Sequence, residues 1–161
     1  MHLPAQLANH IRQVYFGGNW TSVNLKDVLT GLSWQQATTE VYSLNTIAKL
    51  VFHINYYVRA VMKVLQGGPL DAHDQFSFDL PPVRSVEDWE NLVARTWVEA
   101  EDFAGIVDQF PESGLDDIFA DKKYGTYRRN IIGVIEHCHY HLGQIVLIKK
   151  IIQTEEAKGK K

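Results

Sequence analysis

The 161-residue sequence contains a single cysteine, Cys138, and therefore no pair that could form an intrachain disulfide. This absence favours a reducing compartment, because disulfides form and persist in oxidising ones. The N-terminus has no basic segment followed by an apolar one, and we find no apolar run of membrane-spanning length. Together these absences predict a cytoplasmic protein without a membrane partner.

The sequence also lacks an excess of charge of either sign. Its formal net charge is -3, which gives no reason to expect a nucleic-acid surface. A hydrophobic content of 45% with 22% charged residues is typical of a globular protein rather than a disordered one. The length corresponds to one domain large enough to bury a core. We therefore expect a single domain over residues 1–155 and a basic, disordered tail over residues 156–161.

No convincing pair of alternating strand patterns occurs in the sequence, whereas apolar residues at helical spacing occur in four stretches. These stretches are approximately 4–15, 44–66, 86–109 and 127–153. Ser43 and Ser85 are the expected N-caps of the second and third helices. Residues 25–36 favour short helical pieces, and residues 70–84 favour a long crossover without helical period. The pattern predicts an all-α four-helix bundle with a long crossover between helices two and three.

Three histidines and the single cysteine lie within nine residues, 136–144, with the sequence EHCHYHLGQ. His137 and His141 are four residues apart, so they project from one face of the last predicted helix. Two imidazoles at this spacing can bind one cation at about 2.0–2.1 Å per nitrogen. They do not complete a site, so a further ligand has to come from elsewhere in the chain.

His53 is the candidate for this third ligand. It lies mid-helix in AKLVFHINYYV, between Leu50 and Tyr57 on an otherwise apolar face. A polar ring buried there needs a partner, because an unpaired polar group costs about 1–3 kcal/mol. If the second and fourth helices are neighbours, His53, His137 and His141 meet between them, and three nitrogens with an open position are typical of a catalytic zinc-type site. The alternative is three core histidines satisfied by ordinary hydrogen bonds.

The mid-helix His53, followed by HCHYHLGQI in the last helix, resembles the DinB/YfiT-like metalloenzyme superfamily. The family signature is a histidine, three residues, a second histidine, any residue, Gly and Gln. His137, His141, Gly143 and Gln144 match this signature. The resemblance covers nearly the whole chain, although the segment 67–82 is longer than the minimal family pattern.

The resemblance implies a DinB/YfiT-like four-helix bundle that forms a homodimer. It implies one divalent metal ion, most often zinc or nickel, bound by His53, His137 and His141. It also implies a small-molecule substrate and a low-molecular-weight thiol, such as bacillithiol or mycothiol, used in transferase or isomerase reactions. The residues themselves leave three functions open, namely a metal-dependent transferase or hydrolase, a non-catalytic metal-binding bundle, and an interaction module.

Several single residues, most of them in the histidine motif, lead to further predictions. A helical glycine costs about 1 kcal/mol relative to alanine, so Gly143 predicts a close approach of two helices. Gln144 is expected either to hydrogen-bond beside the site or to face solvent. Cys138 is interpreted as a small core residue, and His139 as pointing away from the two candidate ligands. Trp20 is expected in the core or on a pocket wall.

No general base can be named from the sequence. Glu136 and Asn55 are next to candidate ligands or close to them in sequence, but helical geometry directs them to other sides of their helices. The sequence therefore assigns no catalytic residue.

Overall fold

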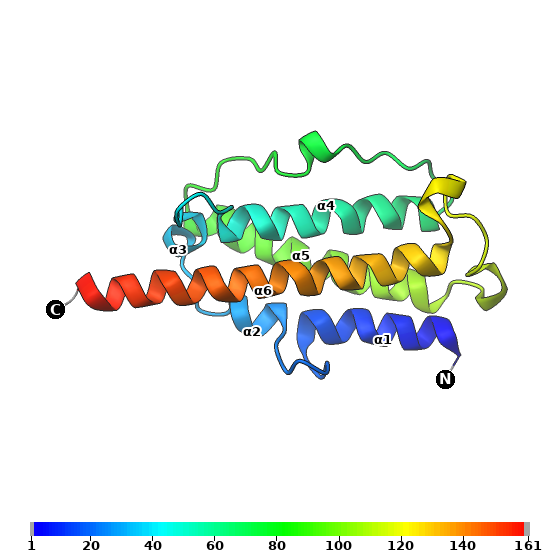
Figure 1. Cartoon of the computed structure of the whole chain (residues 1–161), viewed down its shortest axis with the longest axis horizontal. Coiled ribbons are helices and arrows are strands. Elements are labelled where there is room, and N and C mark those ends of the chain that lie inside the picture. Colours follow the sequence, from blue (N-terminus) through cyan, green and yellow to red (C-terminus); the bar gives the residue numbers. More distant parts are fainter. Residues whose placement is uncertain (1, 160–161) are drawn as a thin grey trace.

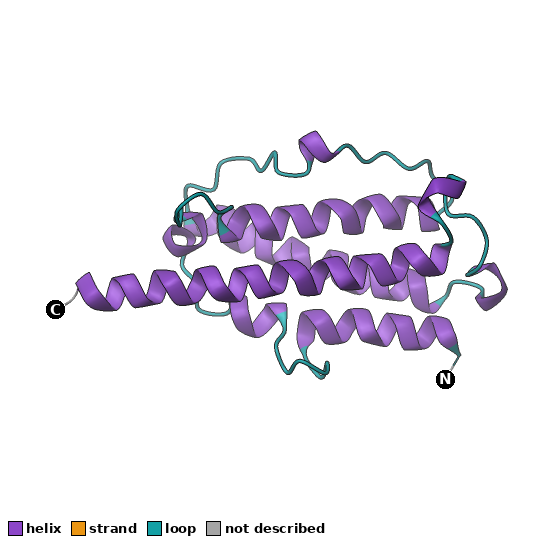
Figure 2. Ribbon diagram, viewed as in Figure 1, coloured by secondary structure: helices purple, strands orange, loops and turns teal. Residues whose placement is uncertain are grey.

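The computed structural model describes residues 2–159, and within this range the chain is all-α (Figures 1 and 2). The long helices are α1 (Leu3–Phe16), α4 (Ile47–Leu65), α5 (Val86–Asp108) and α6 (Tyr127–Gly159), with the short helices α2 (Leu25–Leu29) and α3 (Trp34–Thr38) between α1 and α4. Three single 3-10 turns complete the structure, namely η1 (Asp74–Phe76), η2 (Glu112–Gly114) and η3 (Lys122–Tyr124). No strand occurs in residues 2–159, and only an isolated bridge joins Ile118 to Thr126. The prediction of an all-α fold is confirmed.

The starts of α4 and α5 are fixed by hydroxyl caps. The Ser85 hydroxyl accepts a hydrogen bond from the Asp88 N–H at 3.1 Å, as its sequence position predicts. At α4 the cap is Thr46, whose hydroxyl accepts from the Lys49 N–H at 3.2 Å, so the prediction of Ser43 is wrong. The reason lies just upstream, where Tyr42 has a φ of 51° and the chain turns instead of entering the helix.

The four long helices pack in a closed cycle. α1 contacts α5, α5 contacts α4, α4 contacts α6, and α6 contacts α1. Their inner faces share one hydrophobic core, with Ile11, Ile54, Phe103 and Ile145 each at most 1% exposed. Because α4 and α6 are direct neighbours, side chains from the middle of both helices can meet between them.

Residues 66–85 form the long connection between α4 and α5, as predicted, and this crossover runs alongside α4 (Figure 1, top). The Tyr56 hydroxyl accepts a hydrogen bond from the His73 N–H at 2.7 Å and lies 3.1 Å from the His73 carbonyl. The Tyr57 hydroxyl donates to the Asp74 carboxylate at 2.5 Å. Two consecutive tyrosines of α4 therefore hold the crossover against the helix.

Helix α6 continues to Gly159 instead of ending near Gln153. The first part of the predicted tail, residues 156–159, is thus helical, and residues 160–161 lie outside the described residues. By length and composition alone, α6 is the one helix in the described chain that could span a membrane, contrary to our expectation that no stretch is long enough. In the structure 44% of its most apolar window is buried, and core helices of soluble proteins pass the same test.

Candidate metal centre

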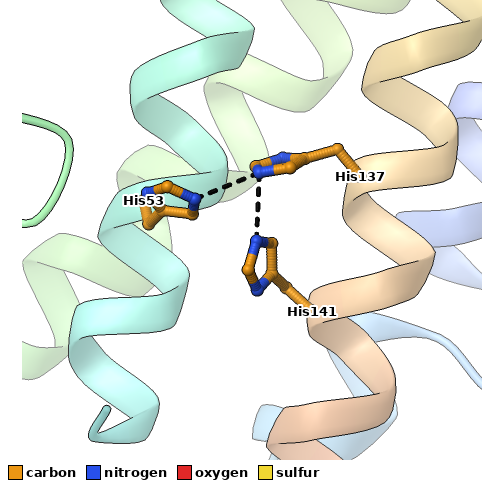
Figure 3. Close-up of side chains that lie close together, drawn as sticks. All are labelled: His53, His137 and His141. Atoms are coloured by element: carbon orange, nitrogen blue, oxygen red, sulfur yellow. Dashed lines mark hydrogen bonds between the residues drawn. The ribbon is translucent and has the colours of Figure 1, made fainter. Parts of the chain in front are cut away.

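Three histidine side chains meet between α4 and α6 (Figure 3). His53 comes from the middle of α4, and His137 and His141 come from successive turns of α6. The Nε2 atom of His137 lies 3.1 Å from Nε2 of His53 and 3.0 Å from Nε2 of His141. His53 and His141 are each only 7% exposed. The structure thus brings together the three residues that the sequence singled out.

The outer nitrogens of two of these rings face oxygen acceptors. Nδ1 of His53 lies 3.3 Å from the carbonyl oxygen of Ser77, and Nδ1 of His141 lies 2.7 Å from the side-chain oxygen of Gln144. An amide oxygen only accepts hydrogen bonds, so both Nδ1 atoms carry the hydrogen. A neutral imidazole has one N–H, and the Nε2 atoms of His53 and His141 therefore present lone pairs to the centre of the cluster.

The Nε2 atom of His137 consequently faces two lone pairs. A single N–H donates well to only one of them, so the other Nε2 atom lies 3.0–3.1 Å from Nε2 of His137 with no hydrogen between the two nitrogens. The other nitrogen of His137, Nδ1, is buried and has no hydrogen-bond partner within residues 2–159. A cation between the three Nε2 atoms removes the conflict, because each lone pair would then point at a positive charge.

Two of the nitrogen pairs, His137 with His53 and His137 with His141, have a spacing that fits a divalent transition metal. Two nitrogens 3.0–3.1 Å apart, each about 2.0–2.1 Å from a cation, define an angle of roughly 95° at that cation. This angle lies between the values of octahedral and tetrahedral coordination. Within the described part of the chain, His53, His137 and His141 form the one group of at least three His, Cys, Asp or Glu residues so placed, with ligand atoms within 4.8 Å of one another. The cluster can hold a metal ion.

Burial keeps the imidazoles of the cluster neutral. The pKa of His137 is lowered to about 4, first by burial and then by the neighbouring His141 and His53. Burial is also the main cause that lowers the pKa of His53 and of His141. Because neutral imidazole is the form that binds metal, no proton has to leave these rings at neutral pH.

Aromatic side chains surround the ring of His53. Phe78, from the crossover, stacks on it with the ring centroids 3.9 Å apart and the planes 7° apart. Tyr57 contacts both His53 and His137 edge-on, at 5.1 Å between ring centroids in each case. Ser77 and Phe78 were not identified from the sequence, where the only indication was the extra length of the segment 67–82.

The cluster borders a pocket of about 530 Å³. His53 and His137 belong to its lining, together with Tyr57, Val61 and Val134. Through this pocket a small molecule can reach one side of the histidine cluster.

The remaining residues of the α6 motif have structural roles. Gln144 hydrogen-bonds to His141, which decides between its two predicted positions. Cys138 is 1% exposed, and its Sγ lies 3.5 Å from the Tyr15 hydroxyl oxygen on the side of α1. Burial raises the pKa of Cys138 to about 12, so it stays a thiol and its interpretation as a core residue is confirmed. Nδ1 of His139 lies 3.1 Å from the Ile135 carbonyl oxygen, away from the cluster as expected.

Two further predictions for single residues, besides the Ser43 cap, are wrong. Gly143 is exposed, and a Cβ atom built on it would meet nothing within 4 Å, so no close helix approach requires this glycine. Trp20 is 100% exposed rather than part of the core or of the pocket wall at the cluster. Glu136 and Asn55 point away from the cluster as expected, since the former pairs with Arg129 and the latter hydrogen-bonds to Thr96.

Comparisons with protein-family models, with curated protein sequences and with solved structures gave no match to this chain. The fold and the site by themselves define an all-α protein with a buried three-histidine cluster that can hold a metal ion.

Proposed function

We propose that this protein is a metal-dependent enzyme that binds one divalent cation through Nε2 of His53, His137 and His141. The observation that carries the proposal is the convergence of these three nitrogens. In His53 and His141, the hydrogen bonds to the Ser77 carbonyl and the Gln144 amide fix the tautomer in which Nε2 presents its lone pair. Zinc and nickel are the metals that the resemblance to the DinB/YfiT-like signature implies, and imidazole ligands suit both.

A catalytic role is supported by the number of ligands and by the pocket. Structural zinc sites have four protein ligands, whereas catalytic sites have three and an open position. Here three histidines converge, and the pocket of about 530 Å³ reaches two of them. When bound, a divalent cation lowers the pKa of a water molecule or thiol in its remaining coordination position and so supplies a nucleophile at neutral pH.

Protein residues around this position shape the pocket rather than exchange protons with a substrate. Burial and the hydrogen bond to Asp74 raise the pKa of Tyr57 to about 12, so its phenol keeps its proton and donates a hydrogen bond to the Asp74 carboxylate. Phe78 and Tyr57 restrict the movement of the His53 ring from its face and its edge.

The reaction that we propose is thiol-dependent transfer to a small electrophile. It is supported by the resemblance of His53, His137, His141, Gly143 and Gln144 to the DinB/YfiT-like signature. The same proposal includes a DinB/YfiT-like four-helix bundle, a homodimer and a cytoplasmic location. A hydrolase would use the same residues with water in place of the thiol.

Metal analysis of the purified protein, followed by assays of small thiols with electrophiles, tests this proposal. We expect about one zinc or nickel ion per chain and thiol conjugation that depends on it. The His53→Ala variant should lose the metal and the activity, while the matched His139→Ala variant should retain both. Full metal content in His53→Ala would refute the site, and metal binding without any turnover would support a non-catalytic bundle instead.

A further inference from the structure

The pocket beside the histidine cluster is positively charged. Besides His53 and His137, its described lining contains Lys123 and Arg129 and no acidic residue. The apolar part of the lining consists of Val61, Val134 and the rings of Tyr57 and Tyr124. The pocket therefore joins a cationic end to the candidate metal centre through a largely apolar passage.

Gly133 keeps this passage open. It lies one helical turn before His137 on the same face of α6 and belongs to the pocket lining. A Cβ atom at this position would lie 3.0 Å from the Arg129 guanidinium, with nothing else within 4 Å. Glycine is disfavoured in a helix relative to alanine, so its presence here is explained by the space that it leaves between Arg129 and His137.

Both cations are available to a ligand. Arg129 pairs with Glu136 at 3.2 Å, but each side chain of that pair is 63% exposed, so the pair is weak and an incoming anion can replace it. The Lys123 ammonium lies 4.8 Å above the Tyr124 ring and is exposed. In the adjoining pocket, the carboxylate of Asp74 already accepts the hydrogen bond of Tyr57.

The first backbone N–H groups of α6 do not contribute hydrogen bonds to this pocket. The N–H groups of Tyr127 and Arg128 donate to the carbonyl oxygens of Asp117 and Leu115. Recognition of an anion therefore depends on the side chains of Lys123 and Arg129.

We infer that this pocket binds a small molecule that carries an oxyanion, held by Lys123 and Arg129, with its reactive end directed along Val134 to His53 and His137. The inference rests on the proposed function and deepens it by naming the substrate class, a small acidic compound. Carboxylates and sulfonates share the required chemistry, and both are compared in the test.

Cobalt-substituted protein provides the test, because a thiolate on cobalt gives a strong charge-transfer band. The protein is titrated with 3-mercaptopropionate, 2-mercaptoethanesulfonate and the uncharged 2-mercaptoethanol. We expect at least one acidic thiol to bind about tenfold more tightly than 2-mercaptoethanol, as two exposed ion pairs allow. Comparing the two acidic thiols shows whether the pocket prefers a carboxylate or a sulfonate.

Substitutions then assign the preference to the two cations. The double variant Lys123→Gln with Arg129→Gln should lose about tenfold in affinity for the acidic thiol and nothing for 2-mercaptoethanol. Lys150→Gln, an exposed change elsewhere on α6, is the matched control and should keep the preference. Gly133→Leu should weaken all three thiols at unchanged cobalt content, since it fills the passage.

The outcomes separate the inference from the function on which it rests. Equal affinities for charged and uncharged thiols, or a preference that survives in the double variant, overturn the inference while the accessible metal stands. Absence of the band with every thiol overturns the proposed function and the inference with it. Cobalt content and circular dichroism of each variant show that the fold and the site are intact.

Discussion

Replacing Gln144 by alanine tests the central argument about the orientation of the ligands. The Gln144 side-chain oxygen lies 2.7 Å from Nδ1 of His141 and fixes the hydrogen on that nitrogen. Without this acceptor the ring can rotate or take its other tautomer, in which Nε2 carries the hydrogen and cannot bind a cation. Loss of such a supporting hydrogen bond typically weakens metal affinity by about 10–100-fold.

The expected effect on stability follows from the affinity. At a free metal concentration about 100 times the dissociation constant, bound metal stabilises the folded protein by roughly 2.7 kcal/mol. A variant that binds about 10–100-fold more weakly retains roughly 1.4 to 0.4 kcal/mol of this at the same concentration. For a chain of this size the difference corresponds to a loss of about 3–9 °C in the metal-induced rise of Tm.

Thermal unfolding with and without zinc measures this quantity, and a chelator competition measures the affinity directly. Comparing the metal-induced shift, rather than Tm itself, cancels the higher helix propensity of alanine. Gln153→Ala, an exposed change on the same helix, is the matched control and should behave as the unaltered protein. A Gln144→Ala protein whose zinc-induced shift equals that of the control would refute the orientation argument.

Three further predictions follow from the site and from the proposed assembly. Without metal, the free energy of unfolding should fall as the pH drops from about 6.5 towards the lowered pKa of His137 at about 4 and should then level off, because the unfolded chain binds the proton at a higher pH than the folded chain does. Urea titrations at several pH values measure this fall. An equally steep fall in the His137→Ala variant would contradict the prediction. Phe78→Ala should destabilise the protein by at least about 0.5–1.5 kcal/mol, the usual contribution of an aromatic pair, and should weaken metal binding because the His53 ring loses its stacking partner. Denaturation with and without zinc measures both effects, and an unchanged zinc affinity would show that Phe78 does not hold the His53 ring in place. For the proposed homodimer, light scattering should give twice the chain mass of 18.4 kDa, whereas a mass near 18.4 kDa would argue against it.

The helical elements and the three histidines were accessible to sequence reasoning because both depend on helical periodicity. His137 and His141 share a face through their four-residue spacing, and His53 joins them because α4 and α6 are neighbours. Cys138 could be assigned to the core for the same reason, since its row on α6 is apolar.

Other features depend on contacts that periodicity does not encode. Ser77 and Phe78 lie in a crossover without helical period, so nothing in their spacing placed them at His53. Gly143 and Gly133 are both helical glycines, but Gly133 lines the pocket at the histidine cluster and Gly143 does not, and the difference depends on the surroundings of each position. The Thr46 cap was missed because Ser43 is an equally suitable residue type, and the backbone turn at Tyr42 decides between them.

The bond between His53 and Ser77 has a consequence for how the site can vary in sequence. The acceptor is a main-chain carbonyl, so a substitution at position 77 does not delete it. The orientation of His53 is instead encoded by the path and the length of the crossover, which the hydrogen bonds of Tyr56 and Tyr57 tie to α4. Deleting one residue between Asp74 and Ser77 should therefore disturb the ligand more than exchanging any single side chain there. For the redesign of this centre, loop length is the variable to hold constant, together with a small residue at position 77, because Ser77 is 1% exposed and its hydroxyl donates to the Asp74 carbonyl oxygen at 2.7 Å.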